Sequence, residues 1–254
     1  MKQEDYLKYI NLIIENKFEE AVQFRRSFLP NYIYKFYPLY SKTGRGKRDK
    51  RTFYTLEENK IWCSKLEHFN DPYEGIGYYF EVSKDTEINL AGCLRVASFT
   101  EEAATNISMW AYYTNNHKGF CVKYKVMSNN SLYDVNYIVK RRSQAQLWLE
   151  ALRKTSRGEA TEQEQFLIYE KYLTKHISWK NEKEYRIIVA TEVEDIYGRA
   201  VDCDRVGLEP MKIYAGIECT EENKRRLRAI SKGLGCGDIG ECAINECEFT
   251  LLNE

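Results

Sequence analysis

The sequence predicts a single α+β domain, in which helices flank a split, mixed sheet and an additional helix precedes it. Short β-branched and aromatic segments alternate with amphipathic segments of helical period. At 254 residues the chain is long enough to bury one large core. No internal repeat, low-complexity tract or linker divides it. We therefore expect an N-terminal helical segment at 1–30 and one α+β domain at 31–254, ending in a strand–helix–strand unit at 211–252.

The first half of the chain predicts one long helix followed by several strands. Apolar residues recur with a period near 3.6 across 4–27, and Pro30 follows them. The polar and basic residues 41–51 predict a loop, and F-N-D-P-Y-E-G predicts a turn at 69–75. Residues 109–113 predict a short aromatic helix or turn. The expected strands cover 32–38, 55–64 (after a helical turn), 94–100 and 119–126.

The second half predicts three helices and three strands. Two helices are expected at 144–154 and 161–175, separated by a Ser-Arg-Gly break. The third helix, 221–232, has Thr220 as its expected N-cap, acidic residues in its first turn and Gly233 at its end. The expected strands are 185–191, 211–217 and the closing segment 242–251.

The charge of the chain is balanced, with 38 Lys plus Arg against 38 Asp plus Glu. No global field therefore favours a nucleic acid or an acidic partner. A local exception is G-R-G-K-R-D-K-R at 44–51, which has five positive residues in eight. It could contact phosphates, but a solvated loop is the commoner explanation, and no G-K-[ST] follows to make a P-loop.

The eight cysteines are scattered and include no C-x-x-C pair. The N-terminus is charged where a signal peptide would be apolar, and no apolar run approaches the roughly 20 residues of a membrane span. We therefore expect a cytoplasmic protein with reduced thiols and no membrane contact. The spacing of Cys236, Cys242 and Cys247 does not fit a standard zinc site, and no metal is expected.

Two glutamates, Glu182 and Glu184, precede the strand at 185–191. Residues two apart on a strand share a face, roughly 6.5–7 Å from each other. Glu184 could then stabilise a ribose hydroxyl and a developing oxocarbenium ion, while Glu182 orients the nucleophile. The alternative is that both are solvated, with Glu184 and Arg186 forming a surface pair worth well under about 1 kcal/mol.

Five motifs, in this order, resemble the signature of a bacterial family of proteins of unknown function. The resemblance extends over roughly residues 32–217. The motifs are Y-I-Y-K-F-Y (32–37), Ser64 with F-N-D-P-Y-E (69–74), S-F-T (98–100), N-I-S-M-W-A-Y-Y-T-N-N-H-K-G-F-C (106–121) and E-K-E-Y-R (182–186).

The order of these motifs is also similar to that of the ADP-ribosyltransferase fold. In that fold a first strand carries a polar reader for nicotinamide, a second ends in Ser or Thr, and a late strand opens with E-x-E. This sequence departs from the pattern by a Lys–aromatic pair on the first strand and by S-F-T in place of S-T-S.

The resemblance implies NAD as the substrate, with ADP-ribose passing to water or to a protein or nucleic-acid acceptor. It also implies a role as a toxin or in anti-phage defence. The implied catalytic residues are Glu184, Glu182 and His117. The implied ligand-binding residues are Tyr34, Lys35, Ser64, Asn70, Asp71, Ser98, Thr100, Trp110, Tyr113 and Arg186.

Two other functions fit the same residues. One is a non-catalytic module that binds a nucleotide or a partner, and the other is a metal-dependent phosphodiesterase that uses Asp71 and Glu74. Individual motifs also have structural explanations, since Asn-Asp-Pro is a good turn in any context. His117 is either an acid or base near neutral pH or a hydrogen-bonded structural residue.

Overall fold

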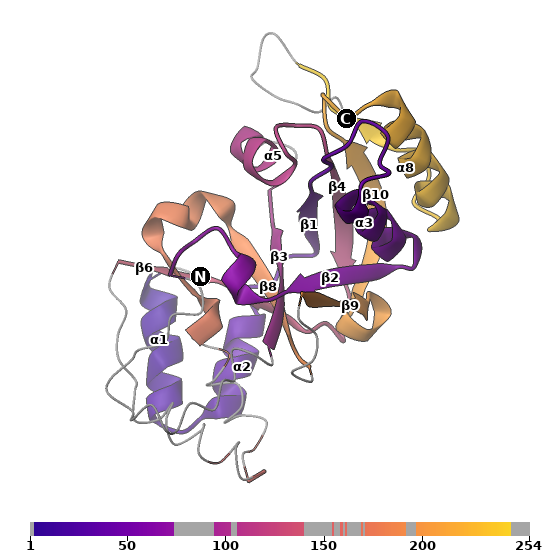
Figure 1. Cartoon of the computed structure of the whole chain (residues 1–254). Helices are drawn as coiled ribbons and strands as arrows, with labels where there is room; N and C mark the ends of the chain where they lie inside the picture. Colours follow the sequence, from indigo (N-terminus) through magenta and orange to yellow (C-terminus); the bar gives the residue numbers. More distant parts are fainter. Residues whose placement is uncertain are drawn as a thin grey trace.

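A mixed sheet that forks beside strand β3 dominates the structure (Figure 1). The computed structural model describes residues 3–73, 94–102, 106–139, 171–191 and 197–244, and the isolated positions 154, 158, 159, 161 and 169. Within that part of the chain, nine strands form the forked sheet and two form a small parallel sheet. The predicted α+β class with a mixed sheet and N-terminal helical structure is confirmed.

The elements follow the chain in this order. The helices are α1 (Gln3–Ile14), α2 (Phe18–Arg26), α3 (Lys47–Glu57), α5 (Ile107–Tyr113) and α8 (Glu221–Gly233). Short 3-10 helices are η1 (Leu66–His68), η3 (Lys171–Leu173), η4 (Ile177–Glu182) and η5 (Asp204–Val206). The first strands are β1 (Tyr32–Tyr37), β2 (Lys60–Ser64), β3 (Leu94–Thr100), β4 (Phe120–Val126), β5 (Leu132–Asp134) and β6 (Asn136–Ile138). The remaining strands are β7 (Thr174–His176), β8 (Glu184–Ala190), β9 (Gly198–Asp202), β10 (Leu208–Ala215) and β11 (Gly240–Glu241).

The fork arises because two strands share one edge of β3. The other edge of β3 pairs with β8 along its whole length. On the shared edge, Thr100 pairs with Tyr34 of β1, whereas Val96 pairs with Ser64 of β2. From β1 the sheet continues through β4 and β10 to β11, and from β2 it continues to β9. The two branches therefore separate next to Ser98, which lies between the two paired positions.

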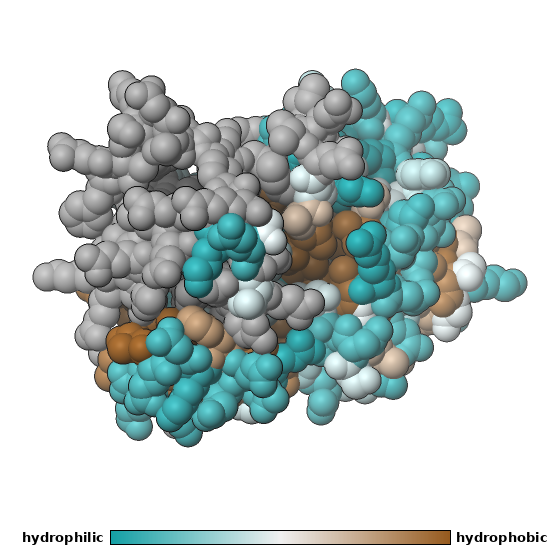
Figure 2. All heavy atoms as spheres, turned by 90° about the horizontal axis from the view of Figure 1, so that it is seen from below, coloured by the Kyte–Doolittle hydropathy of each residue, from teal (hydrophilic) through white to brown (hydrophobic). Residues whose placement is uncertain are grey.

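Each face of the sheet is covered by different helices. Helices α3 and α8 pack on one face, where Phe53 and Leu227 join the largest apolar cluster. On the other face, α1 and α2 cover Val96 of β3 at one end, and α5 covers Phe36 of β1 at the other. Seen from below, the described surface is mostly hydrophilic, with hydrophobic side chains in a recess near its centre (Figure 2). Between the two apolar clusters of this second face lies a strip of polar residues, which includes Tyr34, Ser98 and Thr100.

Two predicted elements of the N-terminal part are wrong. The single helix expected at 4–27 is two helices, because Asn16 takes a left-handed conformation (φ 59°) that reverses the chain between them. The loop expected at 41–51 ends at Gly46, where α3 begins. The polar residues at the start of α3 favoured a loop, but the helix is held by Phe53 and Leu56, which are buried against the sheet.

A buried carboxylate connects α3 to the preceding loop. Asp49 is fully buried and accepts hydrogen bonds from the backbone N–H of Tyr40 (2.9 Å) and Ser41 (2.8 Å) and from the Ser41 hydroxyl (2.7 Å). Replacing Asp49 with alanine should destabilise the protein by about 1–3 kcal/mol, since two backbone N–H groups lose their acceptor. Urea denaturation measures this loss, with Asp202→Ala, at an exposed side chain, as the control. An equal effect of the two changes would contradict this account of Asp49.

Most other predicted elements within the described residues are confirmed. These include the strands near 94–100, 119–126, 185–191 and 211–217 and the helix near 221–232. The Thr220 side chain accepts a hydrogen bond from the backbone N–H of Asn223, as an N-cap does. The end of the helix predicted at 161–175 is wrong, because η3 and β7 occupy residues 171–176. Apart from residue 154, the helix predicted at 144–154 lies outside the described residues, as does most of the closing strand.

The described part of the chain contains free cysteines and short or polar helices. Its six cysteines, Cys63, Cys121, Cys203, Cys219, Cys236 and Cys242, are all free and buried. None of its helices is both long enough and apolar enough to cross a membrane.

Candidate functional site

Four charged residues are buried together where β8 begins beside the fork. They are Lys175 of β7, Glu182 at the end of η4, and Glu184 and Arg186 of β8, and each is at most 6% exposed. Two carboxylates are thus balanced by two cations. We refer to these four residues as the ion cluster.

The two glutamates of E-K-E face inward for a different reason than the sequence suggested. Only Glu184 belongs to strand β8, whereas Glu182 ends η4. Lys183 between them has a left-handed backbone (φ 42°), and its own side chain is half-exposed beside Glu102. This turn, rather than the two-residue period of a strand, directs both carboxylates into the protein.

Lys175 joins the two carboxylates. Its Nζ lies 2.6 Å from Oε2 of Glu182 and 3.1 Å from Oε2 of Glu184. Burial alone would lower the pKa of Lys175, but the two carboxylates raise it above its ordinary value. The ammonium also lies 4.7 Å from the centre of the Trp179 ring, in a cation–π contact.

Arg186 holds Glu184 through two parallel hydrogen bonds. Its Nε donates to Oε1 at 2.7 Å and its Nη2 to Oε2 at 2.9 Å. The guanidinium also donates to the backbone carbonyl of Tyr172 and lies 5.6 Å from the centre of the Phe69 ring. A bidentate pair of this kind fixes the plane of the carboxylate.

Glu184 stays ionised although it is buried. Burial would raise the pKa of this carboxyl, but Arg186, Lys175 and a hydrogen bond with Ser98 lower it to about 2. Near neutral pH the group is therefore a carboxylate. The sequence predicts that Glu184 stabilises a developing positive charge, and the ionised carboxylate has the negative charge needed for that.

Glu182 is linked to the aromatic motif through α5. The hydroxyl of Tyr113 donates to its Oε1. Burial and the charge of Glu182 raise the pKa of Tyr113, and the side chain of Asn70 also hydrogen-bonds this hydroxyl. A further hydrogen bond, from Asn106 to the carbonyl of Asn181 (2.8 Å), joins the N-cap of α5 to η4. The F-N-D-P, M-W-x-x-Y and E-K-E motifs thus meet at one point.

The polar strip of the sheet leads from the ion cluster to the fork. In the strand register Glu184 lies opposite Thr100, which lies opposite Tyr34, so the three side chains share a face. Ser98 lies opposite Arg186 on the same face and is the one half-exposed residue of β3. The hydroxyl of Thr100 accepts from the backbone N–H of Glu102 (3.2 Å) and belongs to the turn that follows the strand.

Lys35 lies on the opposite face of β1, inside the fork. Its Nζ donates to the backbone carbonyl of Ser98 (3.1 Å) and lies near the rings of Phe99 and Tyr37. Burial lowers the pKa of Lys35 to about 8. The ammonium thus donates a hydrogen bond to a β3 carbonyl that lies where β1 and β2 diverge. Ser64 on β2 pairs with Val96, four residues and about 13 Å along β3 from Thr100.

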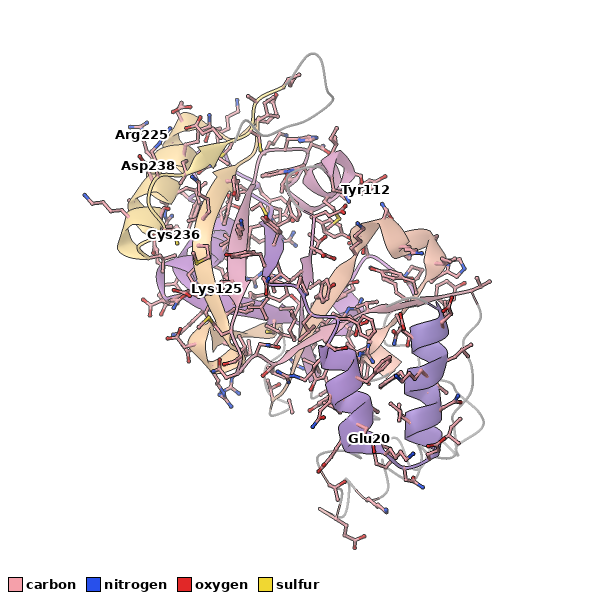
Figure 3. All side chains as sticks on the ribbon, turned by 180° about the vertical axis from the view of Figure 1, so that it is seen from behind. Glu20, Tyr112, Lys125, Arg225, Cys236 and Asp238 are labelled. Carbon is pink, nitrogen blue, oxygen red and sulfur yellow. The ribbon has the colours of Figure 1, made fainter. Side chains whose placement is uncertain are left out.

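The remaining predicted residues lie apart from the ion cluster or have structural partners. Trp110 is fully buried, with its ring 5.1 Å from that of Phe36 in an edge-to-face contact, while Tyr112 on the outer side of α5 is exposed (Figure 3). His117 lies in a left-handed turn before β4, where its carbonyl accepts a hydrogen bond from the backbone N–H of Glu218. Asp71 is buried and caps a turn by accepting from the backbone N–H of Tyr73 (2.9 Å).

The residue that sequence reasoning missed is Lys175. It fell in a predicted helix, and neither its spacing nor its neighbours indicate a contact with residues seven and nine positions later. The available signal was indirect, since two buried carboxylates need nearby cations and Arg186 supplies only one.

Comparison with protein families gives one match to this region. A family described as "Protein of unknown function (DUF2971)" matches residues 109–187. The matched segment runs from α5 to β8 and includes the whole ion cluster and Tyr113, whereas Tyr34, Asn70 and Ser98 lie before it. Searches of curated proteins and of solved structures found no significant match.

Proposed function

We propose that this protein cleaves the bond between nicotinamide and ribose in NAD and transfers ADP-ribose to water or to a macromolecular acceptor. One observation carries the proposal. An ionised, rigidly held Glu184 lies beside the fork of the sheet, on the same face as Ser98 and Tyr34. The proposal is supported by the motif order of the sequence, whose resemblance to the ADP-ribosyltransferase fold implies that Glu184, Ser98 and Tyr34 act on NAD.

The proposed chemistry uses Glu184 as an electrostatic stabiliser. The C–N bond breaks with both electrons leaving on nicotinamide, and the ribose becomes an oxocarbenium ion. Glu184 stabilises this cation and accepts a hydrogen bond from a ribose hydroxyl, and the Ser98 hydroxyl that it releases binds the ligand. Water or the acceptor then adds to the cation and loses a proton. Glu182 orients that nucleophile, with Tyr113 and Lys175 holding its carboxylate in place.

The test is the release of free nicotinamide from NAD by the purified protein, measured by chromatography. Wild type should release it, and Glu184→Gln should lower the rate by about 10²–10³-fold, the usual effect of losing one stabilising group. Glu209→Gln, at an exposed carboxylate of β10, is the matched control and should act like wild type. Since Glu184→Gln also alters the partner of Arg186, thermal melting must confirm that the variant is folded. A folded wild type that releases no nicotinamide, with or without cell lysate, would contradict the proposal.

A second candidate is a non-catalytic module that binds a nucleotide at the same fork. The observation that favours it is the charge balance of the ion cluster, in which Lys175 and Arg186 already neutralise both carboxylates. It predicts that NAD or another nucleotide raises the melting temperature without any release of nicotinamide. A metal-dependent phosphodiesterase has less support, since the carboxylate of Asp71 caps a turn. Its other predicted residue, Glu74, lies outside the described residues.

A further inference from the structure

The outer face of α3 carries four exposed cations that no carboxylate of the described chain pairs with. They are Lys47, Arg48, Lys50 and Arg51, within the first half of the helix. We propose that this surface, the α3 basic face, binds the phosphate backbone of a nucleic acid. The inference is independent of the proposed NAD chemistry.

The cations of the neighbouring helix α8, unlike those of the α3 basic face, are mostly paired with carboxylates. Helix α8 packs beside α3 and is also rich in Lys and Arg (Figure 1). There, Lys224 and Arg228 pair with Glu241 and Glu221, and Arg226 pairs with Glu57 of α3. Arg225, on the outer side of α8, donates to a backbone carbonyl of its own helix (Figure 3). Most cations of α8 are therefore neutralised, whereas those of the α3 basic face are not.

The fold concentrates positive charge on α3 by burying the nearest carboxylate. Asp49 is the acidic residue of the first turn, and it points inward to bind Tyr40 and Ser41. Lys47, Lys50 and Arg51 occupy positions i, i+3 and i+4, so like charges are neighbours on one helix face. They also lie near the positive end of the helix dipole. Both arrangements are unfavourable in the free protein, and a bound polyanion would relieve them.

Two of the cations are held against aromatic rings. The guanidinium of Arg51 lies 4.4 Å from the centre of the Trp62 ring, and that of Arg48 lies 5.4 Å from the Tyr40 ring. Tyr40 and Tyr54 are themselves more than half exposed beside these cations. Oriented guanidinium groups with exposed aromatic rings suit phosphates and unstacked bases.

A nucleic acid fits this surface better than an anionic membrane does. An interfacial helix would present apolar side chains beside its cations, but Phe53 and Leu56 of α3 are buried in the core. The α3 basic face therefore has the charge for either partner and lacks the apolar surface that membrane insertion needs.

The test is fluorescence anisotropy of labelled 20-base-pair DNA and of the corresponding 20-nucleotide single strand. If four cations replace counterions on the duplex, log K should fall with log salt at a slope of about −3.6. Affinity should then weaken about 10²-fold between 50 and 200 mM salt. The double variant Lys50→Gln/Arg51→Gln should halve the slope to about −1.8.

The matched control is Lys224→Gln/Arg228→Gln, which removes the same charge from paired cations of α8 and should keep the wild-type slope. Circular dichroism must show that both variants are folded. Binding that is absent in 50 mM salt, or that weakens equally in both double variants, would overturn the proposal. Binding to vesicles containing phosphatidylserine, with none to either oligonucleotide, would also overturn it, in favour of a membrane partner.

Discussion

Replacing Arg186 with methionine is expected to destabilise the protein by about 3–5 kcal/mol, because it leaves a buried carboxylate without its bidentate partner. Arg186 is fully buried and donates to both oxygens of Glu184 and to the carbonyl of Tyr172. Methionine fills a similar volume but offers none of these donors. The change should appear as a lower midpoint of urea denaturation.

The control for this prediction is Arg45→Met, which breaks an exposed pair with Glu222 (3.3 Å). That loss should stay below about 1 kcal/mol, as is usual for surface ion pairs. If Arg186→Met also costs less than about 1 kcal/mol, the ion cluster contributes little to stability, and its burial would need another explanation.

The second large expected effect is a loss of stability in acid that depends on Glu184. The pKa of Glu184 is about 2 in the folded protein against an ordinary value of 4.5. Between these pH values the unfolded chain binds a proton that the folded one does not. The stabilisation is therefore complete above about pH 4.5 and is lost as pH falls towards 2. The difference of about 2.5 pH units, at roughly 1.4 kcal/mol each, amounts to about 3 kcal/mol.

Urea denaturation of wild type and Glu184→Gln at pH 5, 4, 3 and 2 measures this contribution. The difference in unfolding free energy between the two proteins should shrink by about 3 kcal/mol from pH 5 to pH 2. A difference that stays constant over this range would show that Glu184 is not the group responsible. The matched control is Glu209→Gln, which removes an exposed carboxylate of β10.

Sequence patterns correctly predicted the segments whose residue types favour the same secondary structure that their buried positions require. Strand 94–100 is a short run of apolar and β-branched residues, and helix α8 has a cap, an acidic first turn and a terminal glycine. The errors arose where one residue outweighed the pattern of a whole segment. Asn16 interrupts an otherwise continuous helical stripe, and Asp49 anchors a helix inside a stretch that has the composition of a loop.

The candidate site was predictable in part. E-K-E, Tyr113 and Asn70 were chosen from motifs, and the structure brings them together. The forked sheet also places Ser98 and Tyr34 on the same face as Glu184. Lys175 could not be predicted from the sequence. It lies on β7 and contacts Glu182 at the end of η4, and both elements are too short to give a periodic sequence pattern. The position of Glu182 depends on one left-handed residue, which sequence spacing does not reveal.

The central claim is that the fork beside β3 binds NAD, and calorimetric titration of NAD into wild type and Ser98→Ala tests it most directly. Ser98 is half-exposed at the fork and hydrogen-bonds Glu184. Wild type should bind NAD, and losing this hydroxyl should weaken binding about fivefold to tenfold, as one hydrogen bond of about 1 kcal/mol implies. Ser27→Ala, at the exposed end of α2, should bind as wild type does. No binding isotherm with millimolar NAD, or equal affinity in wild type and Ser98→Ala, would contradict the account.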